Sequence, residues 1–171
     1  MSAYKFYPIM LALLIINLNS KDTQSRENTS FANIQSIISL PLTDIFTISQ
    51  ANNKKDIAAI RAVFDANIKA LTEENLEAAM ATIDETSPFF ERTRNLTELM
   101  FKTYDLKYEI NQFEVLNISE NQATVRISQT TKKIHGPAFR DNILLSKNVV
   151  KKSRGQWKIF STEIESIKYL N

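Results

Sequence analysis

The sequence predicts an α+β domain, in which three N-terminal helices pack on an antiparallel sheet of about four strands. From residue 53 to residue 103, apolar side chains recur every three or four residues, which is the period of amphipathic helices. After Tyr104 the period changes to two, as in half-buried strands. Because the helical and strand patterns are segregated along the chain, they favour helices layered on one face of a sheet.

Three capping signals place the expected helices. We expect the first helix to begin at Asn53, the second after Thr72, and the third after Ser87 with Pro88 at its first helical position. The inward stripe of the first helix is Ile57, Ile60, Phe64, Ile68 and Leu71. The second helix has Leu76, Met80 and Ile83 on its inner side.

Four strands are expected at residues 106–118, 123–134, 142–153 and 157–170. In the first, the inward side slips between Ile110 and Phe113, which predicts a bulge near Asn111 and Gln112. In the last, Trp157 and Ile159 follow a turn that contains Gly, and we expect both to anchor the core.

The N-terminus is typical of a targeting segment. Lys5 precedes an apolar run from Phe6 to Leu18 that is shorter than a membrane-spanning helix requires. Residues 1–20 are therefore predicted to be a signal peptide, with an uncleaved anchor or an ordinary buried segment as alternatives. Residues 21–52 are expected to form a linker and irregular arm, and residues 53–171 the domain. The predicted location is secreted or periplasmic, with membrane contact only through the N-terminal segment.

Composition excludes several classes of function. The 171 residues contain no Cys, one His and two Gly. Thiol catalysis, Cys- or His-rich metal sites and glycine-rich nucleotide loops are thus ruled out, and we expect neither a metal nor a cofactor. The formal net charge of +2 gives no indication of a nucleic-acid partner.

Three segments carry a resemblance to a known superfamily: DIAAIRAVFDANIKAL, NLEAAMATIDETSP and KKSRGQWKIFSTEI, the last with Gly155, Trp157 and Ile159. Their order resembles the nuclear transport factor 2-like superfamily, close to its SnoaL-like branch, over about residues 53–168. The resemblance implies a cystatin-like cone, a curved sheet wrapped around a long helix, with an apolar pocket and frequent homodimers through the sheet. It implies no single function, because the superfamily includes isomerases, dehydratases, cyclases and non-catalytic binding modules.

Five residues are candidates for the pocket. Gln129 and Thr131 continue the inward face of the second strand. Polar residues at that end would suit a half-apolar pocket. The alternative is that the strand simply emerges into water there. His135 is the single imidazole and Arg140 could hold an anionic ligand at the mouth, although ordinary loop roles would explain both.

Glu163 is the fifth candidate. Under strict alternation it shares the inward face of Trp157 and Ile159, where burial would make it a general base or a ligand anchor. A bulge between Ile159 and Phe160 would instead turn Phe160, Thr162 and Ile164 inward and Glu163 toward water. We favour the second arrangement, because an unpaired buried carboxylate is costly.

The expected function is an exported ligand-binding or accessory domain that takes a small apolar ligand in a cone-shaped pocket. The alternative is a cofactor-free isomerase, cyclase or dehydratase, which would need a convergent acid–base pair deep in the pocket. An interaction module that dimerises through its sheet is a third class.

Overall fold

The computed structural model describes residues 42–170, and their side chains from residue 53 onward. Three helices come first: α1 (Leu42–Thr72), α2 (Leu76–Ala81) and α3 (Phe90–Thr103). Four strands follow: β1 (Asp105–Ile118), β2 (Gln122–His135), β3 (Asn142–Ser153) and β4 (Gln156–Tyr169). They form one antiparallel sheet in the order β1-β2-β3-β4, so the predicted α+β fold is confirmed.

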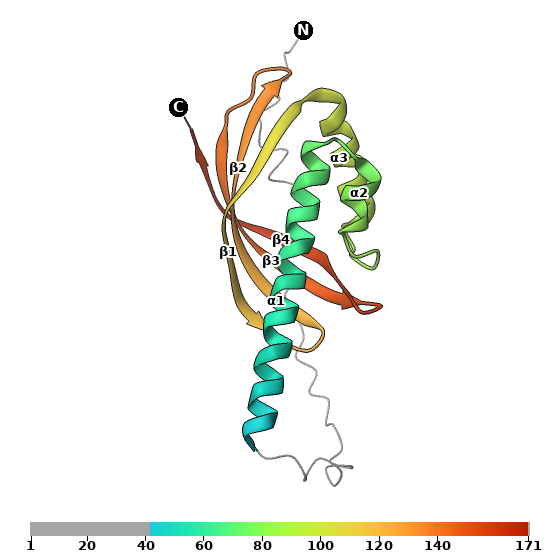
Figure 1. Ribbon diagram of the computed structural model, residues 1–171. Coiled ribbons are helices and arrows are strands. Elements are labelled where there is room, and N and C mark those ends of the chain that lie inside the picture. The colour runs from blue at the N-terminus through green and yellow to red at the C-terminus, as the bar shows by residue number, and fades with distance from the viewer. Residues whose placement is uncertain (1–41, 171) are drawn as a thin grey trace, which may run out of the picture.

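The sheet curves strongly, and the helices lie on its concave side (Figure 1). The long helix α1 crosses in front of the sheet, and its first turns extend beyond the sheet's lower edge, while α2 and α3 lie beside its upper half. Among the described residues, no helix is both long and apolar enough to cross a membrane. The predicted signal peptide and most of the predicted arm lie outside the described residues.

The predicted helix start at Asn53 was wrong, because α1 begins at Leu42 and runs through Asn53. The expectation of irregular structure therefore fails for the end of the arm. Pro41 precedes the helix and no Gly or Pro interrupts the residues that follow. The β-branched residues in this part of the sequence cost a helix only about 0.5 kcal/mol each, and the packing of the same helix further along the chain offsets that cost.

The other two helices are shorter than predicted. Thr72 is the last residue of α1, and α2 is instead capped by Asn75, whose Oδ1 accepts from the Ala78 N–H at 3.0 Å. Ser87 lies in the turn before α3, where its Oγ accepts from the Phe89 N–H at 3.2 Å and donates to the Phe160 carbonyl at 2.7 Å. Its hydroxyl thus connects this turn to β4.

Bulges shape the sheet. The pairing register of β1 with β2 shifts between Ile110 and Gln112, which confirms the bulge predicted there. On β4, Val150 pairs with Ile159 while Val149 pairs with Ser161, so Phe160 is the extra residue of a second predicted bulge. A bulge bends its strand and increases its twist, which contributes to the curvature that the helices fill.

The core lies between α1 and the sheet. Ile60 and Phe64 of α1 pack in one buried cluster with Val125 of β2 and Val150 of β3. Trp157 and Ile159 belong to the same cluster and are each only 4% exposed, so their prediction as core anchors is confirmed.

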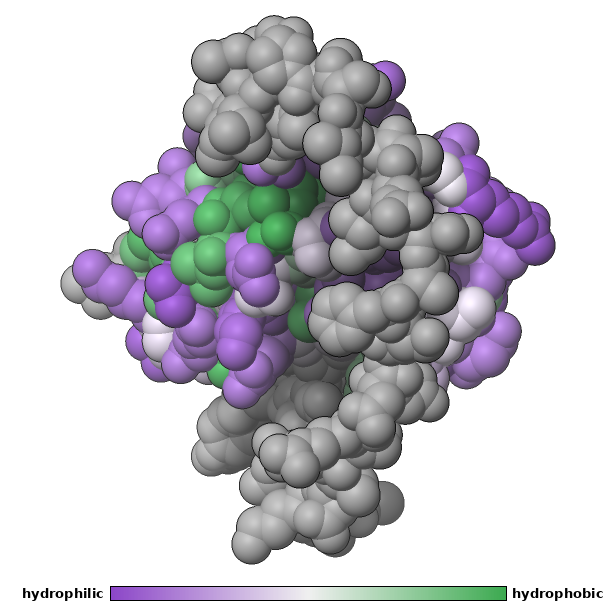
Figure 2. Space-filling view, turned by 90° about the horizontal axis from the view of Figure 1, so that it is seen from below, coloured by the Kyte–Doolittle hydropathy of each residue, from purple (hydrophilic) through white to green (hydrophobic). Residues whose placement is uncertain are grey.

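Asp56 of α1 fastens the helix to the hairpin of β3 and β4. Its Oδ1 accepts from the Trp157 indole Nε1 at 2.9 Å and from the Lys152 Nζ at 3.0 Å. These two contacts, the indole first, hold the pKa of Asp56 below its ordinary value. Seen from below, the described residues show an apolar area that is bordered by hydrophilic residues on its left and lower sides (Figure 2).

Candidate functional site

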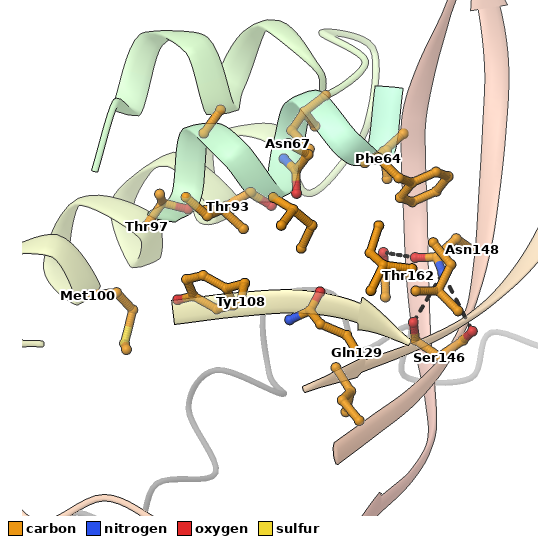
Figure 3. A pocket seen from close by; sticks show the side chains of 18 of the residues that line it. Phe64, Asn67, Thr93, Thr97, Met100, Tyr108, Gln129, Ser146, Asn148 and Thr162 are labelled. Carbon is orange, nitrogen blue, oxygen red and sulfur yellow. Dashed lines mark hydrogen bonds between the residues drawn. The ribbon is translucent and has the colours of Figure 1, made fainter. Parts of the chain in front are cut away.

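A cavity of about 120 Å³ lies between the helices and the concave face of the sheet. Most of its wall is aliphatic, aromatic or thioether in character. Uncharged polar side chains make up the remainder: Asn67, Thr93, Thr97, Tyr108, Gln129, Ser146, Asn148 and Thr162 (Figure 3). Among the described residues that line it there is no Asp, Glu, His, Lys or Arg.

The strands β3 and β4 contribute a chain of three polar side chains at one end of this cavity (Figure 3). Thr162 Oγ1 donates to Asn148 Oδ1 at 2.6 Å, and Asn148 Nδ2 donates to Ser146 Oγ at 3.1 Å. The same Nδ2 faces the backbone carbonyls of Ser146 and Val125, each at 3.5 Å. Because carbonyls only accept hydrogen bonds, this surrounding fixes which way the Asn148 amide points.

Asn67 supplies a polar group from α1. Its Nδ2 donates to Thr82 Oγ1 at 2.8 Å, and the Thr82 hydroxyl donates in turn to the Ala79 carbonyl at 2.6 Å. The Asn67 amide oxygen therefore stays available as an acceptor at the cavity wall.

Tyr108 contributes a phenol to the opposite end from Ser146 and Asn148, near Met100 and Thr97 (Figure 3). Burial is the main cause that raises the pKa of Tyr108, and the negative charge of Glu74 adds to it. The phenol is therefore neutral at ordinary pH and offers a donor rather than a phenolate.

Gln129 is the predicted candidate that lines the cavity. Its Nε2 lies 3.3 Å from Thr131 Oγ1. Thr131 is also inward and is only 1% exposed, but it does not line the cavity. The polar continuation of this strand face thus belongs to the interior and does not emerge into water.

His135 and Arg140 lie outside the cavity lining. The His135 side chain is 80% exposed, and its Nδ1 is 3.2 Å from Asp105 Oδ2. The guanidinium of Arg140 stacks over the Tyr169 ring, 4.3 Å from its centroid. Both side chains therefore have local partners at the ends of strands.

Glu163 is exposed, as expected from a bulge that places Thr162 and Ile164 in the cavity wall. The expectation that Phe160 also turns into the pocket was wrong. Phe160 is the bulged residue itself, is absent from the cavity wall, and has the Lys151 Nζ 3.3 Å from its ring centroid.

Sequence reasoning missed Asn67, Tyr108, Ser146 and Asn148, while Thr162 was placed inward by the favoured bulge but was not named as a pocket candidate. A signal for two of them exists in the segment LLSKNVV, where Ser146 and Asn148 are two residues apart in an otherwise apolar run. Positions two apart share one face of a strand, so a pair of small polar residues on a buried face marks a polar spot in the core.

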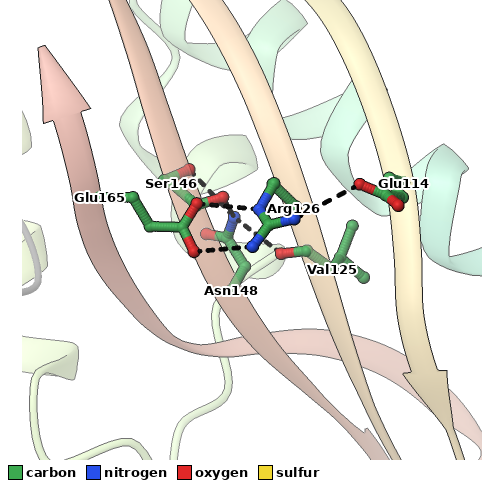
Figure 4. Close-up of polar contacts among 6 residues, drawn as sticks. All are labelled: Glu114, Val125, Arg126, Ser146, Asn148 and Glu165. Atoms are coloured by element: carbon green, nitrogen blue, oxygen red, sulfur yellow. Dashed lines mark hydrogen bonds and ion pairs between the residues drawn. The ribbon is translucent and has the colours of Figure 1, made fainter.

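The outer face of the sheet has a different chemistry. Arg126 of β2 points there and makes a two-pronged contact with Glu165, with Nε to Oε2 at 2.9 Å and Nη2 to Oε1 at 3.2 Å (Figure 4). Glu114 lies 3.7 Å from the same guanidinium. Glu165 is the extra residue of a further β4 bulge, so this ion pair fastens the segment that follows Thr162 and Ile164.

No group of three or more His, Cys, Asp or Glu residues is arranged to hold a metal ion within residues 42–170.

The fold and cavity define a domain with the nuclear transport factor 2-like, cystatin-like fold. The chain is similar to a conserved protein from Planctomyces limnophilus, with a TM-score of 0.59 and 16% identity over 68% of this chain and 99% of that one. It is also similar to a candidate scytalone dehydratase from Novosphingobium aromaticivorans, with a TM-score of 0.58 and 17% identity over 71% and 92% of the two chains. The nuclear transport factor 2-like, cystatin-like fold that the sequence resemblance implied is thus confirmed.

Residues 62–170 match the family described as the C-terminal domain of anti-sigma-I factor RsgI9, and the chain belongs to that family. The anti-sigma-I factor RsgI9 of Acetivibrio thermocellus is 37% identical over 73 residues. That match covers 43% of this chain but 10% of the relative, so the chain spans about a tenth of the length of this curated relative.

Proposed function

We propose that this chain is an exported ligand-binding or accessory domain whose cavity takes a small, uncharged, mostly apolar molecule. The observation that carries the proposal is the make-up of the cavity wall. It combines a large apolar surface with a few hydroxyl and amide groups, which is the usual composition of a small-molecule site.

The size of the cavity limits the ligand. A dry cavity of about 150 Å³ holds one benzene molecule. At about 120 Å³, this cavity suits a single five-membered ring or a short branched chain. We therefore expect a ligand smaller than typical drug-sized molecules.

The family supports a role in sensing or accessory binding. The curated relative is named as an anti-sigma factor, and in a regulatory protein a C-terminal domain that binds a ligand would change state with ligand concentration. We propose that binding, rather than turnover, is what this domain contributes. Export through the N-terminal segment and pairing of two copies through the sheet belong to the same proposal.

The enzyme alternative has less support. An isomerase or dehydratase of this kind needs a buried acid–base pair, and among the described lining residues Tyr108 is the one group that titrates in water. A single neutral phenol can donate a hydrogen bond but does not complete such a pair.

Titration of the full chain with cyclopentanone and cyclopentane, followed by amide chemical shifts, tests the proposal. At least one of the two should bind and shift resonances of cavity residues. Ala79→Leu should abolish that binding, because Ala79 is buried and lines the cavity.

Ala81→Leu is the matched control, since Ala81 is exposed on the same short helix and does not line this cavity. It should bind the compound as the parent does. Failure of both compounds to bind, or equal binding by the Ala79→Leu chain, would contradict the proposal.

A further inference from the structure

The direction of the hydrogen bonds at the Ser146 end of the cavity determines what a ligand meets there. The Asn148 amide is fixed by the two backbone carbonyls, so its Nδ2 donates to Ser146 Oγ and its Oδ1 accepts from Thr162. The Thr162 proton is therefore already used, and its oxygen can only accept a further bond.

Ser146 is left with one unused proton. A serine hydroxyl has one donor proton and two lone pairs, and here one lone pair receives the Asn148 amide. Within residues 53–170, no group accepts a hydrogen bond from the Ser146 hydroxyl. Ser146 is buried, with 5% of the residue exposed, and it lines the cavity.

A buried donor without an acceptor is destabilising, because it has given up its hydrogen bond to water, and a ligand that supplies the acceptor removes that penalty. We propose that the ligand of this cavity carries an uncharged oxygen acceptor, a ketone, aldehyde, ester or ether oxygen, that receives the Ser146 Oγ–H. This inference rests on the proposed ligand-binding function and adds the chemical class of the ligand.

The surroundings select against the charged form of the same ligand. A carboxylate would also accept from Ser146, but no Lys, Arg or His lines the cavity within the described residues. An anion there would lose its hydration without gaining a cation, which is strongly unfavourable. The site therefore favours a neutral acceptor on a ring-sized apolar body.

Three small compounds separate these requirements. Cyclopentanone and cyclopentane have similar size and differ by one acceptor, and isobutyrate carries an acceptor with a negative charge. Dissociation constants are measured by chemical-shift titration of the full chain and of its Ser146→Ala variant. The variant should bind cyclopentanone about three- to tenfold more weakly, which is the worth of one hydrogen bond, and cyclopentane within twofold of the parent.

Two further variants separate hydrogen bonding from folding. Ser146→Thr keeps the hydroxyl and should restore most of the cyclopentanone affinity, while Ser166→Ala, on the exposed side of β4, should change neither constant. A thermal unfolding curve shows whether each variant is folded at the titration temperature.

The outcomes distinguish the two proposals. If neither ring compound binds the parent, the ligand-binding function fails and the inference fails with it. If both ring compounds bind and Ser146→Ala weakens the binding of both equally, the ligand-binding proposal stands, but the inference that the ligand accepts a hydrogen bond from Ser146 is overturned. The inference is also overturned if the parent binds isobutyrate as tightly as it binds cyclopentanone. This comparison needs no variant.

Discussion

Asp56 joins the long helix to the end of the sheet through a single carboxylate oxygen. That oxygen accepts from the Trp157 indole and from the Lys152 ammonium, and the Asp56 side chain is 22% exposed. The contact connects residues far apart in the sequence, so it forms only when α1 docks on the hairpin of β3 and β4.

Asp56→Asn should lower the free energy of unfolding by about 1 kcal/mol at neutral pH, because an amide keeps the geometry and loses the charge. The folded chain holds the Asp56 pKa below its ordinary value of 3.8. The stabilisation is therefore complete above that value and is lost as the pH falls through the folded pKa. Urea unfolding of parent and variant between neutral pH and pH 2 should show the difference closing in the acidic range.

Asp65→Asn is the control for this prediction. Asp65 pairs with Arg61 on the same exposed helix face, and both side chains are more than 40% exposed. That substitution should change stability by less than about 0.5 kcal/mol. A difference between parent and Asp56→Asn that persists unchanged at pH 2 would show that the charge of Asp56 contributes nothing.

At the scale of elements, turns depend on the two glycines in different ways. Gly136 follows β2 with φ +116°, and a Cβ added there would lie 2.7 Å from the Thr103 carbonyl oxygen. Gly155, in the β3–β4 turn, has φ +79° and nothing within 4 Å of the same added atom. The first turn requires both the backbone conformation and the empty space, and the second requires the conformation alone.

Gly136→Ala should therefore destabilise the chain by about 2–4 kcal/mol, while Gly155→Ala should cost about 1–2 kcal/mol. Chemical unfolding of both variants under the same conditions compares them directly. An equal loss in the two would mean that the corner of α3 and β1 moves away from the added methyl group without cost.

Strand bulges explain much of what sequence could and could not predict about the elements. The slip between Ile110 and Phe113 and the adjacent apolar Ile159 and Phe160 both mark real bulges. The shift at Glu165 has a similar mark, because Ile164 and Ile167 are three residues apart with Glu165 and Ser166 between them, but that bulge was not predicted. Which side chains reach the cavity depends on these bulges. The inward positions of Gln129 and Thr162 were therefore predictable, whereas Asn148 required the pairing register.

At the scale of the whole molecule, the order of helices and strands followed from the change of period at Tyr104, and that order is sufficient for the fold class. The beginning of α1 could not be predicted in the same way. Asn53 is a suitable N-cap residue, and nothing in the sequence indicates that the helix runs through it instead of starting there. Over 31 residues, α1 is about 46 Å long, longer than the core that it covers.

A chain that begins at Asn53 should stay soluble and unfold in one cooperative transition. Within the part whose side chains are described, the first core residue is Ile60, so the core is intact in the shortened chain. A chain that begins at Asp65 removes Ile60 and Phe64 and should not fold. Circular dichroism during thermal unfolding tests both, and aggregation of the Asn53 chain would mean that the earlier turns of α1 belong to the core.

Trp157 gives the molecule a built-in optical signal. It is the only tryptophan in the sequence, its ring is buried, and its indole N–H is bonded to α1. Fluorescence emission therefore reports a single place, the junction of the long helix with the last strand, and not an average over many rings. Any condition that lifts the helix from the sheet brings this indole into water and moves its emission to longer wavelength, even if the rest of the sheet stays paired.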